Sequence, residues 1–223
     1  MGLIAIGDVH GCAVTLDHLL DRLAPTPDDH LVFVGDYVDR GPDSRGVLDR
    51  LVAMQKAADA GDGPRCTFLR GNHDQMMLDY VDEGRFDLWR VNGGLSTLSG
   101  YVDGDRLAIP AEHLDFLRAT ELVAEIDGFV FVHAGLRPNL SVEENLATGT
   151  ADVFLWERSH LVAEHLAWEK PVVCGHTPQH EPLDRPLLID IDTGCCYHDR
   201  PGFGTLTAVR LPEREFVQVP FAG

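Results

Sequence analysis

Five short polar segments of this sequence carry aspartate, asparagine and histidine at close spacing, each with a glycine inside or beside it. They are Gly7-Asp8-Val9-His10-Gly11, Gly35-Asp36-Tyr37-Val38-Asp39-Arg40-Gly41, Arg70-Gly71-Asn72-His73-Asp74, His133-Ala134-Gly135 and Gly175-His176-Thr177. Their carboxylate, amide and imidazole groups form a mixed oxygen and nitrogen donor set, which suits first-row divalent ions such as manganese, iron or zinc better than calcium. The glycines let the backbone turn sharply and bring short side chains to one centre. The segments therefore predict a metal centre.

Ligand-type residues in this number indicate two ions. Paired ions in hydrolytic sites lie only about 3.5–4 Å apart, so one carboxylate must bridge them. Such a pair lowers the pKa of a bridging water to about 7, which gives a hydroxide nucleophile at neutral pH, and it neutralises phosphoryl oxygens. A serine alkoxide is a poor leaving group, so a phosphoserine substrate also needs a positioned acid, worth about 10²–10⁴ in rate. This chemistry is compatible with hydrolysis of a phosphate ester.

A strand candidate directly precedes each polar segment. These apolar runs are Leu3 to Ile6, Leu31 to Val34, Cys66 to Leu69, Phe129 to Val132 and Val172 to Cys174. Because parallel sheets place ligands beyond the carboxyl ends of their strands, we expect all five segments to converge on one crevice.

Helical patterns separate the first strand candidates. Leucines recur at helical spacing over residues 16–23, and similar patterns cover residues 47–54 and 114–122. This strand and helix alternation predicts parallel strands and an α/β fold. Further strand candidates at 187–191, 205–211 and 216–219 follow, and the last two leave no room for a helix between them. We therefore expect the sheet to be mixed toward its carboxyl-terminal end.

Composition limits the class of protein and its partners. The chain has 223 residues and a formal charge of −18, which disfavours binding to nucleic acid or to an anionic membrane. Its five cysteines are odd in number and lack a Cys-x-x-Cys pair, which argues against a disulfide framework and favours a cytoplasmic protein. We expect one domain over residues 1–223, with an inserted segment like a cap at about 75–128. The oligomeric state is left open.

The ordered segments resemble the signature of PPP-type metallophosphoesterases, the family of serine/threonine protein phosphatases, which reads G-D-x-H-G, G-D-x-V-D-R-G, G-N-H-[ED], H-[AG]-G and G-H. All five blocks are present in this order between Gly7 and Thr177. The sequence is most similar to short bacterial and phage members, through residues 71–77, Asn92-Gly93-Gly94 and residues 133–138. The third block ends in Asp74, where protein phosphatases usually have glutamate. The resemblance implies a layered α/β fold, with a central β-sandwich flanked by helices.

The resemblance also implies two divalent metal ions, with manganese ahead of iron or zinc, and a set of ligands. The first ion would be held by Asp8 and His10, with Asp36 bridging to the second, and Asn72, His133 and His176 would complete the second ion's ligands.

Catalytic and substrate-binding roles follow from the same resemblance. His73 would be the general acid, oriented by Asp39, and Arg40 would bind phosphoryl oxygens through its planar guanidinium. A second phosphate-binding arginine lies between the last two histidine blocks in the family. Arg158 matches it best, although Arg137 lies in the same interval.

Most of these residues have an ordinary structural interpretation when taken singly. The aspartates could cap turns or helices, and the histidines could be satisfied core residues, so only membership of the five-block set favours ligation. The other seven histidines, His113 and His160 among them, are expected on the surface or on helices. Asp190 and Asp192 are either partners of a metal-bound histidine or turn residues. Tryptophans 89 and 156 are expected to pack the core or cap rather than to stack on substrate.

We therefore expect a metal-dependent phosphoprotein phosphatase acting on phosphoserine or phosphothreonine. One alternative is a symmetrical diadenosine tetraphosphate hydrolase, which shares the five blocks and differs in the cap; the charge of −18 mildly disfavours so anionic a nucleotide. The other alternative is a non-catalytic relative that binds proteins. It is disfavoured because a pure binder has no need of His73, Asp39 and Arg40 beside the metal ligands.

Overall fold

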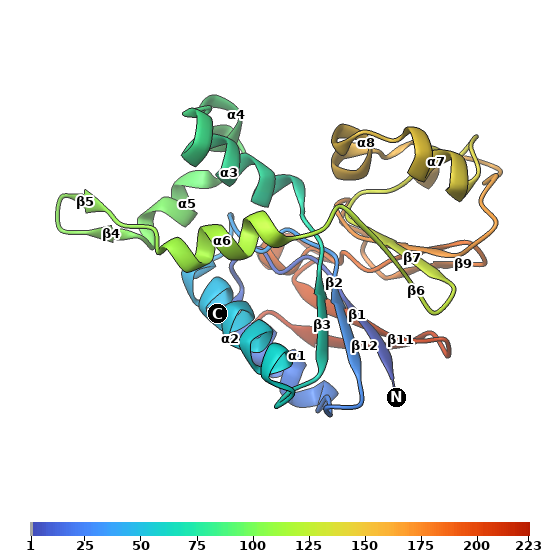
Figure 1. Cartoon of the computed structure of the whole chain (residues 1–223), viewed down its shortest axis with the longest axis horizontal. Coiled ribbons are helices and arrows are strands. Elements are labelled where there is room, and N and C mark those ends of the chain that lie inside the picture. Colours follow the sequence, from blue (N-terminus) through green and yellow to red (C-terminus); the bar gives the residue numbers. More distant parts are fainter. Residues whose placement is uncertain (1) are drawn as a thin grey trace.

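Two five-stranded sheets form the centre of the protein, whose computed structural model describes residues 2–223 (Figure 1). The first sheet has the order β12-β11-β1-β2-β3, with bounds β1 Leu3–Ile6, β2 His30–Phe33, β3 Arg65–Phe68, β11 Thr205–Leu211 and β12 Glu215–Pro220. Strands β1, β2 and β3 are parallel, whereas β11 is antiparallel to both β1 and β12. The predicted parallel start and mixed end are both confirmed.

The second sheet carries the later strands in the order β6-β7-β8-β10-β9. Their bounds are β6 Val123–Ile126, β7 Phe129–Val132, β8 Val172–Cys174, β9 Leu183–Arg185 and β10 Leu188–Asp190. The sequence analysis missed β6 and β9, which form the antiparallel edges. Strand β6 turns into β7 through Asp127 and Gly128, both at positive φ. Asp-Gly is a strong hairpin signal, so β6 was predictable.

Apolar side chains fill the space between the two sheets. Ala5 of the first sheet and Phe131 and Ile189 of the second are fully buried in one cluster there. Because successive strand residues point to opposite faces, Ile4 and Ile6 lie in a different cluster, which joins the first sheet to its helices. This arrangement confirms the β-sandwich that the family resemblance implies.

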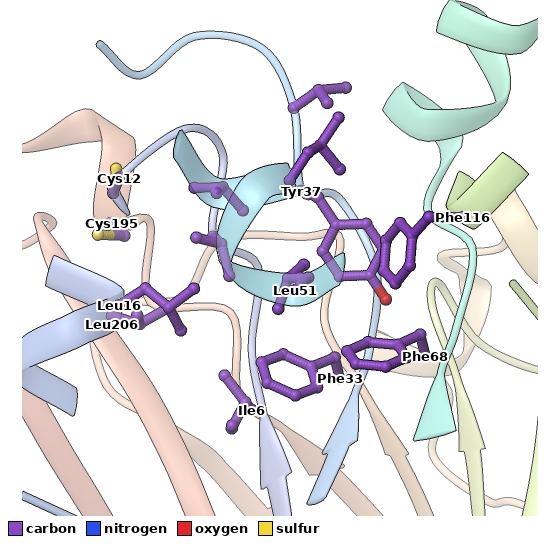
Figure 2. Packing of buried hydrophobic residues seen from close by; sticks show 14 of the residues in the cluster. Ile6, Cys12, Leu16, Phe33, Tyr37, Leu51, Phe68, Phe116, Cys195 and Leu206 are labelled. Carbon is purple, nitrogen blue, oxygen red and sulfur yellow. The ribbon is translucent and has the colours of Figure 1, made fainter. Parts of the chain in front are cut away.

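Helices α1 (Ala13–Leu23) and α2 (Ser44–Ala60) cover the outer face of the first sheet (Figure 1). Figure 2 shows Leu16 and Leu51 over the sheet, where the rings of Phe33 and Phe68 stack with centroids 5.0 Å apart. Asp43 caps α2, since its Oδ1 accepts a hydrogen bond from the Gly46 amide at 2.7 Å. Both predicted helices are thus confirmed.

Residues 75–128 contain several small elements. The helices are α3 (Asn72–Glu83), α4 (Asp87–Val91), α5 (Gly94–Ser99) and α6 (Ala111–Ala119), and a small hairpin comprises β4 (Val102–Asp103) and β5 (Arg106–Leu107). The hairpin and α4 project away from both sheets (Figure 1).

The helix predicted over residues 114–122 extends three residues beyond the carboxyl-terminal end of α6. Helix α6 stops at Ala119, and Thr120 is already extended. Beyond it the chain rejoins the sheets, because the amide of Glu121 donates to the carbonyl of Phe68 at 3.0 Å and the amide of Arg70 donates to the carbonyl of Glu121 at 2.7 Å.

The outer face of the second sheet packs against helices α7 (Val142–Thr148) and α8 (Ala151–Trp156), followed by the short 3-10 helix η1 (Ser159–Leu161). A second 3-10 helix, η2 (Cys195–Tyr197), lies before β11. All five cysteines are free thiols. Within residues 2–223, no helix is long and apolar enough to cross a membrane.

Candidate metal centre and active site

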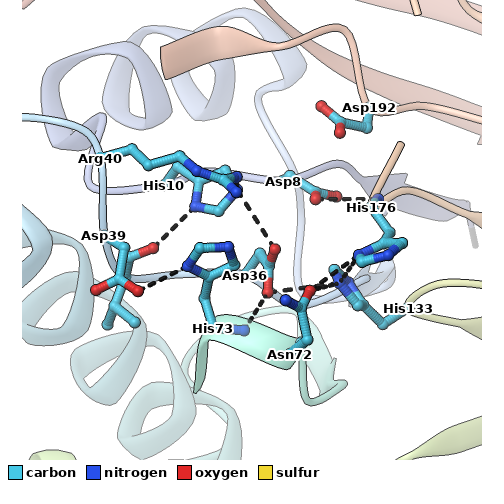
Figure 3. A network of polar contacts seen from close by, with 12 residues as sticks. Asp8, His10, Asp36, Asp39, Arg40, Asn72, His73, His133, His176 and Asp192 are labelled. Carbon is cyan, nitrogen blue, oxygen red and sulfur yellow. Dashed lines mark hydrogen bonds and ion pairs between the residues drawn. The ribbon is translucent and has the colours of Figure 1, made fainter. Parts of the chain in front are cut away.

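Loops at the carboxyl ends of five strands bring the predicted ligands together (Figure 3). Asp8 follows β1, Asp36 follows β2, Asn72 begins α3 directly after β3, His133 follows β7 and His176 follows β8. The first three strands belong to one sheet and the last two to the other. The centre therefore lies where the two sheets meet at their carboxyl ends, as expected from parallel strands.

Asp36 lies between two groups of potential ligands. One group combines Asp36 with His10 and His73, and the other combines it with His133 and His176; the ligand atoms within each group lie within 4.8 Å of one another. Asp36 Oδ2 lies 3.3 Å from His10 Nε2, and Asp36 Oδ1 lies 3.4 Å from His133 Nε2. A carboxylate shared by both groups is what a bridging ligand requires.

Asn72 and Asp8 complete the two groups. Asn72 Oδ1 lies 3.0 Å from His133 Nε2 and 2.9 Å from His176 Nδ1. Asp8 Oδ2 accepts a hydrogen bond from the His176 amide at 3.0 Å, so the two ends of the centre are joined. Asp8 Oδ1 and His176 Nε2 are buried and have no partner.

The donor atoms of this centre fit cations. His10 donates its Nδ1 proton to the Val38 carbonyl, and His133 donates its Nδ1 proton to the Val34 carbonyl, each at 2.9 Å. Their Nε2 atoms therefore carry lone pairs that face the oxygens of Asp36. Lone pairs this close repel unless a positive charge offsets them, as the guanidinium of Arg40 does in part at His10 Nε2. The residues present accordingly fit two divalent ions, and the backbone carbonyls fix the tautomers that ligation needs.

Burial keeps the imidazoles neutral. It lowers the pKa of His10 well below its ordinary value, with the guanidinium of Arg40 adding to the effect. Burial, followed by His133, lowers the pKa of His176 to about 2. The pKa of Asp8 is raised, first by burial and then by the carboxylates of Asp192 and Asp36. Neutral histidines are ready ligands, and a cation would restore the charged form of Asp8.

Several non-glycine residues here have left-handed backbone conformations. Positive φ occurs at His10 (44°), Asp36 (54°), Asp39 (75°), Arg40 (70°) and His176 (70°). Each conformation costs about 1–3 kcal/mol and must be imposed by the surrounding structure. Asp74 imposes part of it, because its carboxylate accepts the amides of Asp36 and Tyr37 at 2.9 and 3.0 Å. The aspartate that departs from the usual glutamate thus holds the turn carrying Asp36.

His73 and Asp39 form a buried pair beside the first group. Asp39 Oδ2 lies 2.6 Å from His73 Nδ1, and the two side chains are 0% and 1% exposed. Because an ionised carboxylate only accepts, Nδ1 carries the proton and Nε2 is left as the other functional atom. Trp89, expected to pack the core, is fully buried and also donates its Nε1–H to Asp39. No motif of the sequence indicates this contact, which depends on how the segment between β3 and β6 folds.

Two arginines lie beside the centre. Arg40 donates to His10 Nε2 at 2.6 Å, and its guanidinium carbon lies 5.4 Å from the centroid of the Tyr197 ring. Burial lowers the pKa of Arg158, the positive charge of Arg40 adds to this effect, and the carboxylate of Asp36 opposes it. The backbone carbonyl of Arg137 accepts a hydrogen bond from the indole N–H of Trp168 at 3.1 Å. Arg158 is the better placed of the two candidates for a second phosphate-binding residue.

The remaining singled-out residues are buried, except Trp156, which is half-buried. Asp192 lies near Asp8 and His176 (Figure 3), and its amide donates to Asp190 at 3.0 Å. Trp156 packs its ring edge-on against His176, with centroids 5.8 Å apart. His113 and His160 lie on α6 and η1, but contrary to a surface placement both are fully buried.

A β-sandwich whose strand ends gather these ligands around two adjacent cation-fitting groups defines the class of metal-dependent phosphoester hydrolases. The chain belongs to the calcineurin-like phosphoesterase family, whose model matches residues 1–204.

Similar proteins carry more than one activity in their names. The chain is 30% identical to the asymmetrical bis(5'-nucleosyl)-tetraphosphatase PrpE of Halalkalibacterium halodurans, over 96% of this chain and 92% of that protein. It is 29% identical to serine/threonine-protein phosphatase 1 of Salmonella typhimurium, over 92% of this chain and 90% of that protein. A crystal structure of a putative diadenosine tetraphosphatase superposes with a TM-score of 0.72 at 26% identity, covering 100% of this chain and 94% of the other.

Proposed function

We propose that the chain is a two-metal phosphoprotein phosphatase that removes phosphate from serine or threonine side chains. The ligands would be Asp8, His10 and Asp36 for one ion, and Asp36, Asn72, His133 and His176 for the other. Bound there, two divalent cations would lower the pKa of a water molecule to about 7 and neutralise phosphoryl oxygens. We propose manganese as the native metal, because the donors are oxygen and imidazole nitrogen without thiolate.

The buried pair of His73 and Asp39 carries this proposal. Asp39 holds the Nδ1 proton of His73 at 2.6 Å, which orients Nε2 toward the group formed with His10 and Asp36. From there a protonated His73 can give its Nε2 proton to the leaving oxygen. An alkoxide from serine or threonine needs that proton, whereas a nucleotide phosphate leaves as a stable anion and needs it far less. The presence of a positioned acid therefore favours an alkyl phosphate ester.

Arg40 and Arg158 complete the proposed mechanism by holding the phosphoryl group. Each guanidinium can donate two parallel hydrogen bonds to phosphoryl oxygens, which fixes the orientation of the group for in-line attack. The positive charge of Arg40 acts on Arg158, and the carboxylate of Asp36 acts on both guanidiniums. An incoming phosphate dianion would stabilise both positive charges.

A second candidate function is hydrolysis of a bis(5'-nucleosyl) tetraphosphate. Tyr197 carries the guanidinium carbons of both Arg40 and Arg200 on its ring, at 5.4 and 4.3 Å from the centroid. Arg200 is exposed, so it extends the cationic surface outward from Arg40. This extension, with an aromatic ring at its centre, suits a phosphate chain and a base, and several similar proteins bear that activity in their names.

The five free thiols support a reducing compartment, and we propose the cytoplasm. We propose no nucleic-acid or membrane partner, because a formal charge of −18 repels these anionic partners.

Turnover of three substrates by wild type and His73→Asn tests the proposal. The substrates are a phosphoserine peptide, p-nitrophenyl phosphate and diadenosine tetraphosphate, each with manganese. We expect His73→Asn to keep its metals and to lose about 10²-fold or more on the peptide, with a much smaller loss on the aryl ester, whose leaving group needs no proton. His113→Asn is the matched control, since His113 is equally buried but bonds Tyr101 and Asp49 instead.

Two outcomes would change the assignment. Equal losses on both esters, or loss of a metal ion from His73→Asn, would make His73 a ligand or a phosphate binder rather than an acid. Faster turnover of diadenosine tetraphosphate than of any phosphopeptide would favour the second candidate. In that case Arg200→Gln should lower kcat/KM for the dinucleotide and leave the aryl ester unchanged.

A further inference from the structure

The carboxylate of Asp39 is held by the inserted segment as well as by His73. Trp89 on α4 donates its indole Nε1–H to both oxygens, at 3.0 Å to Oδ1 and 2.8 Å to Oδ2. Thr97 on α5 donates its hydroxyl to Oδ1 at 2.6 Å. All four side chains are fully or almost fully buried. The acid pair is therefore also fixed by two residues that lie 50 and 58 positions along the chain from Asp39.

The backbone around these donors is built for close approach. Gly93, at φ 113°, packs on Arg40 and Asp39, since a Cβ there would lie 3.2 Å from Arg40 Cγ and 3.5 Å from Asp39 Cβ. A Cβ on Gly94 would lie only 2.5 Å from the ring of Trp89. The glycine pair thus places the tight turn between α4 and α5 against both Asp39 and the indole.

Proton counting shows that the hydrogen bonds are directional. The indole can only donate, and the Asp39 carboxylate can only accept. Thr97 has one hydroxyl proton, and it donates this proton in the hydrogen bond to Asp39. The hydroxyl oxygen of Thr97 therefore accepts hydrogen bonds from the Ser44 hydroxyl at 3.0 Å and from the Asp39 amide at 2.9 Å. The Asp39 amide is shared between Thr97 Oγ1 and Ser44 Oγ, each at 2.9 Å. The Thr97 hydroxyl and the indole together hold both carboxylate oxygens of Asp39, which fixes the carboxylate plane.

We propose that Trp89 and Thr97 are positioning residues for the general acid: they fix the Asp39 carboxylate, and Asp39 fixes His73. This inference rests on the proposed role of His73 and adds that the inserted segment takes part in the reaction without touching the substrate. When one of the two donors is removed, the Asp39 carboxylate can rotate. The imidazole of His73 then loses the orientation that points Nε2 at the leaving oxygen. Hydrogen bonds to charged acceptors are the strong ones, so each donor matters.

Thr97→Val and Thr97→Ser form a matched pair for the test. Valine keeps the shape of threonine and removes the hydroxyl, whereas serine keeps the hydroxyl and removes a methyl group. We expect Thr97→Val to lower kcat on a phosphoserine peptide about tenfold, which is less than the roughly 10²–10⁴ that a general acid supplies, with KM and metal content unchanged. The loss on p-nitrophenyl phosphate should be less than about twofold. Thr97→Ser should restore the peptide activity.

Trp89→Phe tests the second donor in the same way, since phenylalanine keeps an aromatic ring in the buried site and removes the N–H. We expect the same selective loss on the peptide. Ser99→Ala is the control, because Ser99 also lies on α5 but is exposed and bonds only the carbonyl of Ser96. Thermal unfolding of each variant, measured beside activity, confirms that the compared proteins are folded.

Adding Thr97→Val to His73→Asn separates positioning from a structural role. If Thr97 acts through His73, the double variant should be no slower on the peptide than His73→Asn alone. A further tenfold loss in the double variant, or equal losses on both esters in Thr97→Val, would overturn the inference. If His73→Asn itself shows no preference between the esters, the proposed acid role fails first. The two failures are thus distinguishable.

Discussion

Gly175→Ala should displace Asp8 and weaken the first metal position. A methyl group on Gly175 would lie 2.0 Å from Asp8 Oδ1 and 3.1 Å from Val34 Cγ2. The carboxylate must move by about 1 Å or more to restore even a tight contact, because carbon and oxygen do not approach so closely. Gly175 has no positive φ, so the added methyl causes the effect without backbone strain. A shift of about 1 Å at a reacting centre can cost about 10²-fold in rate.

The assay is metal content after dialysis against a low manganese concentration, together with kcat/KM on p-nitrophenyl phosphate. We expect Gly175→Ala to retain one ion well and the other poorly, and to lose about 10²-fold in kcat/KM. Gly100→Ala is the matched control, since its methyl would meet the Thr97 carbonyl at an ordinary 3.4 Å. Full metal content and activity in a folded Gly175→Ala protein would refute the placement of Asp8 as a ligand.

Three further predictions concern the metals and a buried histidine. Asp36→Asn should lower manganese content more than His176→Asn, because Asp36 faces both ligand groups; equal retention in both would show that the bridge is misassigned. Chelation should abolish turnover and lower the thermal midpoint, and returned manganese should raise both; a midpoint indifferent to metal contradicts the site. His160, whose pKa burial lowers from 6.5 to about 4, is neutral in the folded protein while the unfolded chain takes up its proton. The free energy of unfolding that this difference contributes, about 3 kcal/mol, is present above pH 6.5 and is lost as the pH falls toward 4. The free energy of unfolding of His160→Leu, measured by denaturant titration, should therefore fall less steeply than that of wild type over this pH range.

The central fold was predictable because its strands are short apolar runs with polar segments at their ends. Parallel β1, β2 and β3 and the late antiparallel β11 and β12 lie where the pattern places them. Edge strands β6 and β9 were missed because they are only partly buried and lack a continuous apolar run. The end of α6 was misplaced because Leu122 continues the helical spacing, while pairing of Glu121 with the edge of the first sheet overrides it.

The clustering of the candidate ligands was predictable from residue type and order, since six side chains of metal-binding chemistry follow five strands. The support around them was not. Nothing in the sequence joins Trp89 or Thr97 to Asp39, because that contact depends on how an irregular segment folds back over the site. Asp74 is another case, since its hydrogen bonds to the backbone of Asp36 and Tyr37 arise only when the third block lies beside the second.

The charge distribution shows how a protein with a formal charge of −18 could act on the phosphate dianion of the proposed substrate. Asp8, Asp36, Asp190 and Asp192 are all buried at one end of the sandwich, where burial raises the pKa of Asp8 and of both late aspartates. Buried carboxylates in this number are costly unless cations neutralise them. Two divalent ions would offset the charge of these four carboxylates, and Arg40 and Arg158 would add positive charge beside them, so the local field at the centre would oppose that of the surface. The buried aspartates add to the negative charge of the chain, but they are also the groups that would bind the cations, and those cations would attract the substrate.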